Sequence, residues 1–365
     1  MKQPRSKVIN GEFVVQKLTG VQRMARELVR ELDSIVQKGE AVLVTPKYAA
    51  NDLGLKNIEV VQYVRVPSTK IGHPISYLWE SICMSFYLLT HRSVSVNLCG
   101  TRPLLRPDFA IIHDVLYKSH PQFFTGASII NKKFHSLVYW YTFRLIKHIF
   151  TDSQYTKEMI IKYYKVRPDQ ITVVGCGWQH YERIDFDDSI YNTFPILKER
   201  GFFFSLGSLA LHKNMAWVLN AAKYNPDYIF CITGEASINR AVYTDIPPNV
   251  LFTGRLSDGQ VKTLMRDCKA LIFPSFCEGF GLPPLEALSV GAKIIISNST
   301  CLPEVYGDSA IYIDPFDSNV NMDALLKTPT SDPQAILAKY SWKKSAEQIY
   351  ETVNRFYSAD KKPNK

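Results

Sequence analysis

The sequence predicts an α/β protein with two domains, each built on a parallel sheet wrapped by helices. The chain has 365 residues, which is more than a single hydrophobic core usually serves. Short apolar runs typical of buried strands alternate with stretches of helical periodicity, as in strand–helix–strand units. This alternation stops at a Pro- and Asp-rich passage, Tyr181–Pro195, and then begins again. We therefore expect a first domain over residues 1–185, a linker, and a second domain over 195–340.

The first domain is expected to supply one parallel sheet. Residues 21–36 carry apolar side chains at helical spacing, which predicts a helix that begins at Thr19-Gly20. The runs that predict strands in this domain are 41–44, 60–66, 94–97, 109–112, 148–151 and 171–174.

The second domain repeats the pattern, with a glycine after several of its strands. A helix is expected from Asn214 to Lys223 and another from Pro283, since proline is tolerated in the first turn of a helix. The final segment, 331–357, also has helical character. The runs that predict strands in this domain are 202–206, 228–233, 250–253, 270–273 and 293–297.

The formal net charge of +9 predicts an acidic partner. Nucleotide phosphates, a lipid headgroup surface and nucleic acid all fit the charge alone. The seven cysteines are scattered and odd in number, which favours reduced thiols in a cytoplasmic protein. Residues 1–10 are short and basic without an apolar core, and no run reaches the length of a membrane span. We therefore expect a cytoplasmic protein without a secretory signal.

The stretch Phe273–Glu286 combines a strand end, a glycine turn and a helix start. This combination binds anions, because free N–H groups and the helix dipole face the ligand and glycine allows close approach. Glu278 and Glu286 flank the seven residues between them, and a carboxylate beside a phosphate would be repelled by it. We therefore interpret both as acceptors for sugar hydroxyl groups. A surface Glu and an ordinary helix Glu remain the alternative.

Three other residues occupy positions where parallel sheets bind ligands. His113 directly follows the strand at 109–112, and Lys213 lies in the loop after the strand at 202–206. The carboxyl ends of such strands line the ligand crevice, where a cation could meet a diphosphate. Gly20 begins the first predicted helix and is a second candidate for an anion. The alternatives are a His that caps a strand end, a solvated Lys and an ordinary helix start.

Residues 201–315 resemble the retaining glycosyltransferases of family four. The resemblance is carried by Gly207–Asn214, Leu251–Asp258 and above all Pro274–Ala287, and it continues through 291–296, 303–305 and 307–310. The first half matches more loosely at Gly20, at 112–114, 151–153 and 171–177. The family's fold is GT-B, in which two Rossmann-like domains face a deep cleft. The resemblance implies this fold here, with the closing helix, 341–357, returning to the first domain.

The resemblance also implies roles for individual residues. Glu278, His113 and Lys213 would be catalytic: Glu278 at the donor sugar's hydroxyls, His113 near the anomeric centre and Lys213 at the diphosphate. Glu286 would bind the ribose, and Gly20 would touch the leaving phosphate. The residues that the resemblance assigns to donor binding are Gly20, Ser208, Asn214, Arg255, Gly279, Phe280, Gly281, Leu282 and Glu286.

Two positions depart from the family pattern. Many members place Arg directly after the glycine that is Gly207 here, whereas this chain has Ser208. Some relatives have Arg before the Lys, where this chain has His212. One phosphate-binding cation is therefore missing or is supplied by another residue, for which Arg255 and Arg23 are the candidates.

The implied function is transfer of a hexose from a nucleotide diphosphate sugar. GDP-mannose is favoured by similarity to bacterial surface-polysaccharide enzymes, and UDP- and dTDP-sugars are the alternatives. The acceptor would be a glycan or a polyprenyl-linked oligosaccharide. No Asp-x-Asp metal motif is evident, so we expect no metal and no cofactor besides the donor, and no nucleic-acid partner. The alternatives are a non-catalytic nucleotide-sugar or glycan-binding subunit and a sugar-nucleotide epimerase.

Residues 131–150 predict a helix with a basic arc. Lys133, Trp140, Arg144 and Lys147 fall on one side at about 100° per residue, with Lys132 nearby, and Phe134 is among the apolar residues of the remainder. An arc of this kind fits an anionic membrane surface, which a lipid-linked acceptor would require. Ordinary core packing with the basic arc in water explains the pattern as well.

Overall fold

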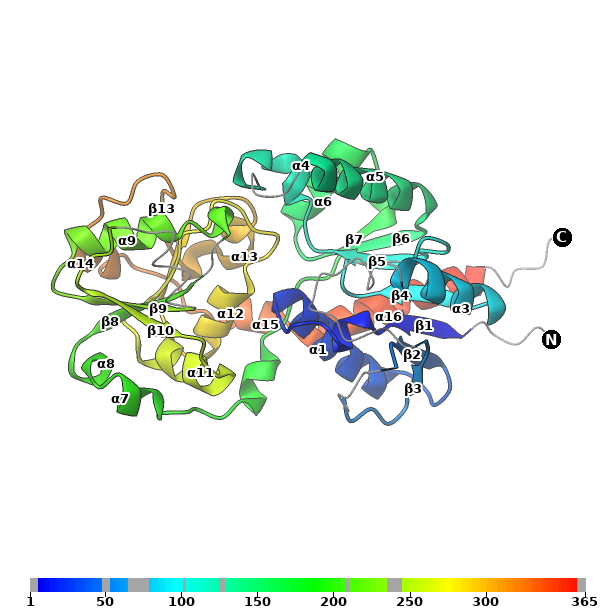
Figure 1. The fold of residues 1–365 in the computed structure, drawn as a ribbon, viewed down its shortest axis with the longest axis horizontal. Coiled ribbons are helices and arrows are strands. Elements are labelled where there is room, and N and C mark those ends of the chain that lie inside the picture. Colours follow the sequence, from blue (N-terminus) through cyan, green and yellow to red (C-terminus); the bar gives the residue numbers. More distant parts are fainter. Residues whose placement is uncertain are drawn as a thin grey trace. The chain divides into compact units, whose positions relative to one another are not determined.

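The structure, a computed structural model, describes residues 6–47, 53–64, 79–100, 103–124, 129–207, 210–234 and 245–359. The chain divides into two compact units (Figure 1). Unit 1 comprises Met1–Val115, Ser128–Gly177 and Ser341–Lys365. Unit 2 comprises Leu116–Ala127 and Trp178–Tyr340.

Unit 1 is built on a seven-stranded parallel sheet with the order β3-β2-β1-β4-β5-β6-β7. Because sequence order reverses between β1 and β4, the topological switch point lies at the carboxyl ends of these two strands. The strands are β1 (Lys7–Asn10), β2 (Ala41–Thr45), β3 (Glu59–Gln62), β4 (Val94–Asn97), β5 (Phe109–Ile112), β6 (His148–Thr151) and β7 (Ile171–Val173).

The strand β1, which lies inside this sheet between β2 and β4, was not predicted from the sequence. The predicted run 60–66 is longer than β3, which ends at Gln62, and residues 65–66 lie outside the described residues.

Helices cover the strands of unit 1. The helices are α1 (Gly20–Ile35), α3 (Ser85–Thr90), α5 (Ile129–Leu145), α6 (Gln154–Tyr164) and α16 (Trp342–Ala359), with short turns η1 (Glu12–Val14), η2 (Trp79–Met84) and η4 (Pro168–Gln170). The closing helix α16 packs against α1, although more than 300 residues separate them in the chain (Figure 1). Phe143 of α5 and Ile160 of α6 are buried against Ile112 of β5, so these helices share one core.

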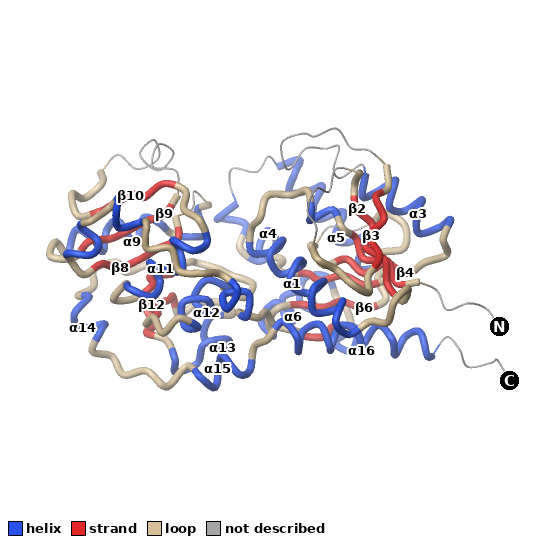
Figure 2. The backbone as a smooth tube through the Cα atoms, turned by 90° about the horizontal axis from the view of Figure 1, so that it is seen from below, coloured by secondary structure: helices blue, strands red, loops and turns tan. Residues whose placement is uncertain are grey.

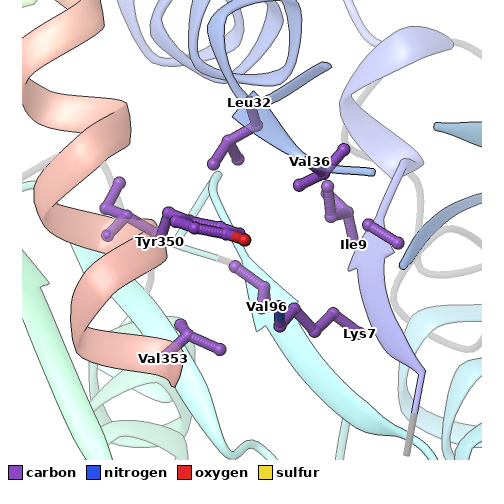
Figure 3. Close-up of a pocket in the computed structure, with 9 residues that line it drawn as sticks. Lys7, Ile9, Leu32, Val36, Val96, Tyr350 and Val353 are labelled. Atoms are coloured by element: carbon purple, nitrogen blue, oxygen red, sulfur yellow. The ribbon is translucent and has the colours of Figure 1, made fainter. Parts of the chain in front are cut away.

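A small cavity of about 20 Å³ remains between β1, β4 and the helices α1 and α16 (Figure 3). Apolar side chains such as Ile9, Leu32 and Val353 form most of its wall. At one side, Lys7 pairs with Glu40, whose carboxylate also accepts a hydrogen bond of 3.0 Å from the Tyr350 hydroxyl. Since this pocket lies at the amino end of β1, away from the strand ends that bind ligands, we assign it to packing of α16.

Unit 2 is built on a six-stranded parallel sheet with the order β10-β9-β8-β11-β12-β13. Its switch point lies between β8 and β11, where the sequence order reverses. The strands are β8 (Phe202–Leu206), β9 (Ile229–Thr233), β10 (Val250–Gly254), β11 (Leu271–Phe273), β12 (Ile294–Ser297) and β13 (Ile311–Ile313). The first five match the strands predicted from the sequence within one residue at each end, and β13 was not predicted.

Helices lie on either side of the strands of unit 2 (Figure 2). Trp217 of α9 is fully buried against Phe203, Phe230 and Ile272 of the sheet. The helices are α4 (Leu116–Ser119), α7 (Ile190–Thr193), α8 (Ile196–Glu199), α9 (Met215–Tyr224), α11 (Asp258–Asp267), α12 (Leu282–Ser289), α13 (Leu302–Tyr306), α14 (Met322–Leu326) and α15 (Gln334–Lys339). Short turns are η3 (Pro121–Phe124), η5 (Gln179–Arg183), η6 (Leu211–Lys213) and η7 (Gly307–Ser309).

The passage Tyr181–Pro195 is not the linker that its composition predicts. It belongs to unit 2, which begins at Trp178 rather than after residue 185. Tyr181 and Ile190 are buried, and the ammonium group of Lys262 donates to the carbonyls of Tyr181 and Ile184, both at 2.6 Å. These contacts bind the passage to α11, so its Pro and Asp residues form turns on the surface of the unit.

All seven cysteines are free thiols, and five of them are buried. Among the described residues, no helix combines the length and apolar character needed to cross a membrane.

Candidate functional site

The switch point of unit 2 brings together two of the predicted residues. Lys213 ends η6, which follows β8, and Glu278 lies in the loop after β11. The Lys213 Nζ donates to Glu278 Oε1 at 2.7 Å. The Glu278 side chain is only 10% exposed, whereas that of Lys213 is 30% exposed. The pair therefore places one cation and one carboxylate where a parallel sheet binds its ligand.

A buried asparagine holds the loops around this pair. Asn214 has a left-handed backbone with φ of 53°, and its side-chain amide donates to the carbonyls of Pro274 at 3.0 Å and Pro315 at 2.8 Å. The amide thus joins the loop after β8 to those after β11 and β13. Asn214 was predicted to contact the donor, but in this structure its amide positions the loops.

The backbone of Glu278 is fixed as well. Its N–H donates to the Thr300 hydroxyl at 3.1 Å, and its carbonyl accepts from the Cys301 thiol at 3.3 Å. Burial is the main reason why the pKa of Cys301 lies well above its ordinary value, with the Glu278 charge adding to it. Cys301 therefore stays a neutral thiol donor.

Gly281 starts α12 in a conformation that favours glycine. Its φ is +83°, and a Cβ at this position would come within 2.7 Å of Leu302 Cδ2. The Tyr306 hydroxyl donates to its carbonyl. The first N–H groups of α12, beginning at Leu282, have no partner within the helix. This is the geometry of an anion-binding helix N-terminus.

Phe280 lies between Gly279 and Gly281, and its side chain serves the packing of this loop. It is buried, and its ring meets the Tyr340 ring edge-on with centroids 5.1 Å apart. The side chain therefore anchors the turn rather than contacting a ligand.

Glu286 lies in the second turn of α12 and is nearly buried, with a side-chain exposure of 9%. Its Oε1 accepts a hydrogen bond from His180 Nε2 at 2.9 Å, and the His180 side chain is 2% exposed. Sequence reasoning missed this partner, because a single His in an irregular segment carries no signal of its own.

In unit 1, His113 lies at the carboxyl end of β5 between two acceptors. Its Nδ1 is 2.9 Å from Asp152 Oδ2, and its Nε2 is 3.3 Å from the Leu98 carbonyl. Burial acts to lower the pKa of His113, but Asp152, with Asp114 and the Leu98 carbonyl, outweighs burial and raises the pKa above its ordinary value. Since both partners accept, both ring nitrogens act as donors, which favours the imidazolium form.

Asp152 is a functional candidate that the sequence analysis did not single out. It follows β6 directly, and β6 is the neighbour of β5 in the sheet, so the two strand ends bring Asp152 to His113. Its other oxygen, Oδ1, is buried without a hydrogen-bond partner among the described residues. A polar residue directly after a predicted strand was the available signal.

Of the remaining predicted residues, Gly20 and Arg23 belong to unit 1 and Arg255 belongs to unit 2. Gly20 begins α1, a Cβ there would meet nothing within 4 Å, and the neighbouring Thr19 N–H is bonded to Gln22. Arg255 is exposed after β10, and Arg23 is half-buried in the first turn of α1. Ser208 lies outside the described residues.

The arrangement in unit 2 can bind an anion and a polyhydroxyl group side by side. Lys213 and the start of α12 offer positive charge and N–H donors, and Glu278 offers an acceptor within 3 Å of the cation. In the part of the chain that the structure describes, no three His, Cys, Asp or Glu side chains gather so as to hold a metal ion.

Comparison with known proteins agrees with this combination of fold and site. Residues 188–339, which lie within unit 2, match the family described as glycosyl transferases group 1. The chain is similar to the O-antigen chain mannosyltransferase RfbU of Salmonella typhimurium, with 26% identity over 65% of this chain and 64% of that protein. It is also similar to the serotype-specific mannosyltransferase WbdA of Escherichia coli, with 24% identity over 95% of this chain and 44% of that protein. The chain thus spans less than two thirds of the length of these relatives.

A solved structure shows the same fold. The sucrose-phosphate synthase of Thermosynechococcus elongatus superimposes with a TM-score of 0.73 at 14% sequence identity, covering 97% of this chain and all of the other. The two parallel-sheet, Rossmann-like units together are the GT-B fold, as the sequence analysis expected.

Proposed function

We propose that this protein, whose second unit carries a glycosyl transferases group 1 domain, is a glycosyltransferase. It moves a hexose from a nucleotide diphosphate sugar to a glycan or lipid-linked acceptor, with retention of configuration at the anomeric carbon. The donor favoured is GDP-mannose, because the relatives RfbU and WbdA are both named as mannosyltransferases.

The observation that carries the proposal is the ion pair between Lys213 and Glu278 at the switch point of unit 2. A cation beside the N-terminus of α12 suits a diphosphate, and a carboxylate next to it suits the hydroxyls of the attached sugar. Few ligands other than a nucleotide sugar present a diphosphate and a polyhydroxyl ring side by side.

The proposed step follows from charge. The bond between the anomeric carbon and the diphosphate oxygen breaks, and its electron pair leaves with the diphosphate. Lys213 and the first N–H groups of α12 offset this charge, and one such preorganised donor commonly contributes about 3 to 4 kcal/mol. The sugar gains oxocarbenium character, and the acceptor hydroxyl attacks the face from which the diphosphate departs, passing its proton to the leaving oxygen.

Glu278 orients the sugar hydroxyls and Glu286 the ribose. We assign His113 to a place near the anomeric centre, where its imidazolium form cannot act as a base. This follows because both of its nitrogens face acceptors in the structure, Asp152 and the Leu98 carbonyl.

A lipid-linked acceptor would bring the protein to an anionic membrane surface. On α5, Leu137, Trp140 and Leu145 are exposed, and the Arg144 guanidinium lies 3.9 Å from the Trp140 ring centroid. Phe143 and Ile146 are buried in the core, so the helix has one packed and one open face. The Lys147 Nζ forms an ion pair with Asp108 Oδ1 at 3.2 Å. The side chains of Lys132, Lys133 and Phe134 are not among those that the structure describes.

Vesicle flotation tests this surface. Binding to anionic but not neutral liposomes, weakening as salt rises, is expected. Equal recovery in the soluble fraction with both vesicle types would leave α5 as an ordinary core helix.

The transfer itself is tested with purified protein, a polyprenyl-linked oligosaccharide acceptor and GDP-mannose, UDP-galactose or a dTDP-hexose as donor. Mass spectrometry of the lipid product should show one added hexose from one donor. Nucleotide-sugar binding without transfer or donor hydrolysis would favour a binding subunit, and conversion of the donor sugar itself would favour an epimerase.

A further inference from the structure

The Glu286 carboxylate is nearly buried, and its predicted contact with the ribose does not explain what stabilises its charge there. A carboxylate that is only 9% exposed loses most of its hydration and needs a partner. Its only hydrogen bond with a described residue is that from His180 Nε2 to Oε1 at 2.9 Å. Its second oxygen, Oε2, makes no hydrogen bond with the described residues.

His180 is held from two sides. On the α15 side, the Trp178 indole N–H donates to the Leu337 carbonyl at 3.0 Å, and the Gln179 amide donates to the Tyr340 carbonyl at 3.2 Å. On the other side, the neighbouring Tyr181 is buried against α11, where its hydroxyl lies 3.4 Å from Met265 Sδ. The turn η5 is therefore fixed to both helices, and the imidazole cannot follow Glu286 if the carboxylate moves.

The same anchor also supports the turn before α12. Tyr340, whose carbonyl receives the Gln179 amide, packs edge-on against Phe280. The segment that presents His180 to Glu286 is thus connected through one residue to the loop that holds Glu278. Glu286 is therefore held by η5 through His180, and the loop of Glu278 is held by Tyr340 through Phe280.

We propose that His180 is a positioning residue of the donor site, which holds Glu286 Oε1 so that Oε2 is presented to the ribose hydroxyls of a nucleoside diphosphate. This inference rests on the proposed function, since it assumes that a nucleotide binds beside α12. His180, which lies 106 positions before Glu286 in the chain, would thus set the orientation of the carboxylate that binds the ribose.

The consequence is selectivity for the sugar of the nucleotide. A carboxylate that is held through one oxygen can accept hydrogen bonds from the ribose hydroxyls in one geometry only. A nucleotide that lacks those hydroxyls makes no hydrogen bond with it. Loss of the His180 N–H leaves the carboxylate free to rotate and removes its only described partner. The penalty should therefore appear with ribonucleotides and vanish with dideoxyribonucleotides.

The test compares GDP with 2′,3′-dideoxy-GDP by titration calorimetry of the full chain, and UDP with 2′,3′-dideoxy-UDP in the same way. The wild-type protein should prefer one ribonucleotide over its dideoxy analogue by about tenfold or more, the usual range for hydrogen bonds to a charged group. In His180→Ala this preference should fall to about twofold or less, with the Kd of the dideoxy analogue unchanged. His180→Gln keeps an N–H donor and should recover most of the preference.

His148→Ala is the matched control, because His148 is also a buried histidine with a side-chain hydrogen bond, 2.8 Å to Thr172, but lies in unit 1. It should lower the melting temperature without changing the ribose preference. Equal weakening of both analogues in His180→Ala and His180→Gln, or a preference unchanged from the wild type, would overturn the role of His180. If the wild-type protein binds none of these nucleotides, the proposed function fails, and the role of His180 fails with it.

Discussion

Glu278→Gln should have opposite effects on binding of the bare nucleotide and on sugar transfer. In the structure the Glu278 carboxylate lies 2.7 Å from Lys213 Nζ, the cation expected to meet the diphosphate. An anion bound on the far side of Nζ would lie about 5 to 6 Å from the carboxylate, and two like charges at that distance repel by about 3 kcal/mol at an effective dielectric near 20.

Solvent reduces this repulsion, because the Lys213 side chain is 30% exposed. A net effect of about 1 kcal/mol corresponds to about fivefold in Kd. The neutral amide should therefore tighten binding of GDP about fivefold. It should also lower turnover with the sugar donor by at least about tenfold, because it is a poorer acceptor for sugar hydroxyls.

Calorimetry with GDP and steady-state kinetics with GDP-mannose measure the two effects. Glu199→Gln is the control, since Glu199 is an exposed carboxylate of unit 2 outside the site. It removes the same charge and should change neither quantity. Weaker GDP binding in Glu278→Gln would refute the electrostatic reasoning.

Four other substitutions give separate readouts. Glu286→Ala should raise the donor KM more than it lowers saturated turnover, because ribose contacts change little during reaction; kinetics with the opposite pattern would place Glu286 at the anomeric centre. His113→Ala should impair transfer and leave the GDP affinity nearly intact in calorimetry, and a large loss of affinity would argue against its predicted place. Because the folded pKa of His113 is raised above 6.5, its pair with Asp152 should stabilise the fold fully below about pH 6.5 and lose this effect as pH rises through the folded value. Urea unfolding of wild type and Asp152→Asn across that range should show the difference shrinking with pH, and a constant difference would contradict it. Gly281→Ala should cost about 1 to 3 kcal/mol in the same unfolding measurement, from its φ of +83° and the contact with Leu302, and a neutral effect would show that the loop adjusts.

The sheets could be predicted because buried parallel strands are continuous apolar runs. The runs at 109–112 and 202–206 match β5 and β8 residue for residue. The interior strand β1 has only two apolar residues, Val8 and Ile9, between Lys7 and Asn10, so it gives no such run. Its burial comes from the strands on both sides, which a local pattern does not contain.

Some residues of the candidate site could likewise be predicted from the sequence, and others could not. Glu278, Gly281 and Glu286 could be predicted because strand end, turn and helix start follow one another in the sequence. His180 could not, because the contact that defines it joins residues 106 positions apart. For Asp152 the sequence offered only its place directly after a predicted strand, since its contact with His113 spans 39 positions. The linker prediction failed for the same reason, since Pro and Asp residues that usually mark a boundary here form turns packed on α11.

The most direct measurement of the central claim is the turnover of Lys213→Ala and Glu278→Ala with saturating donor and acceptor. The two side chains meet at the switch point of unit 2, and both are proposed to act on the sugar–diphosphate bond as it breaks. Each variant should fold with near-wild-type circular dichroism and lose at least about tenfold in turnover, one order of magnitude per 1.4 kcal/mol of lost transition-state stabilisation. Near-wild-type turnover in both folded variants would contradict the assignment of this ion pair to catalysis.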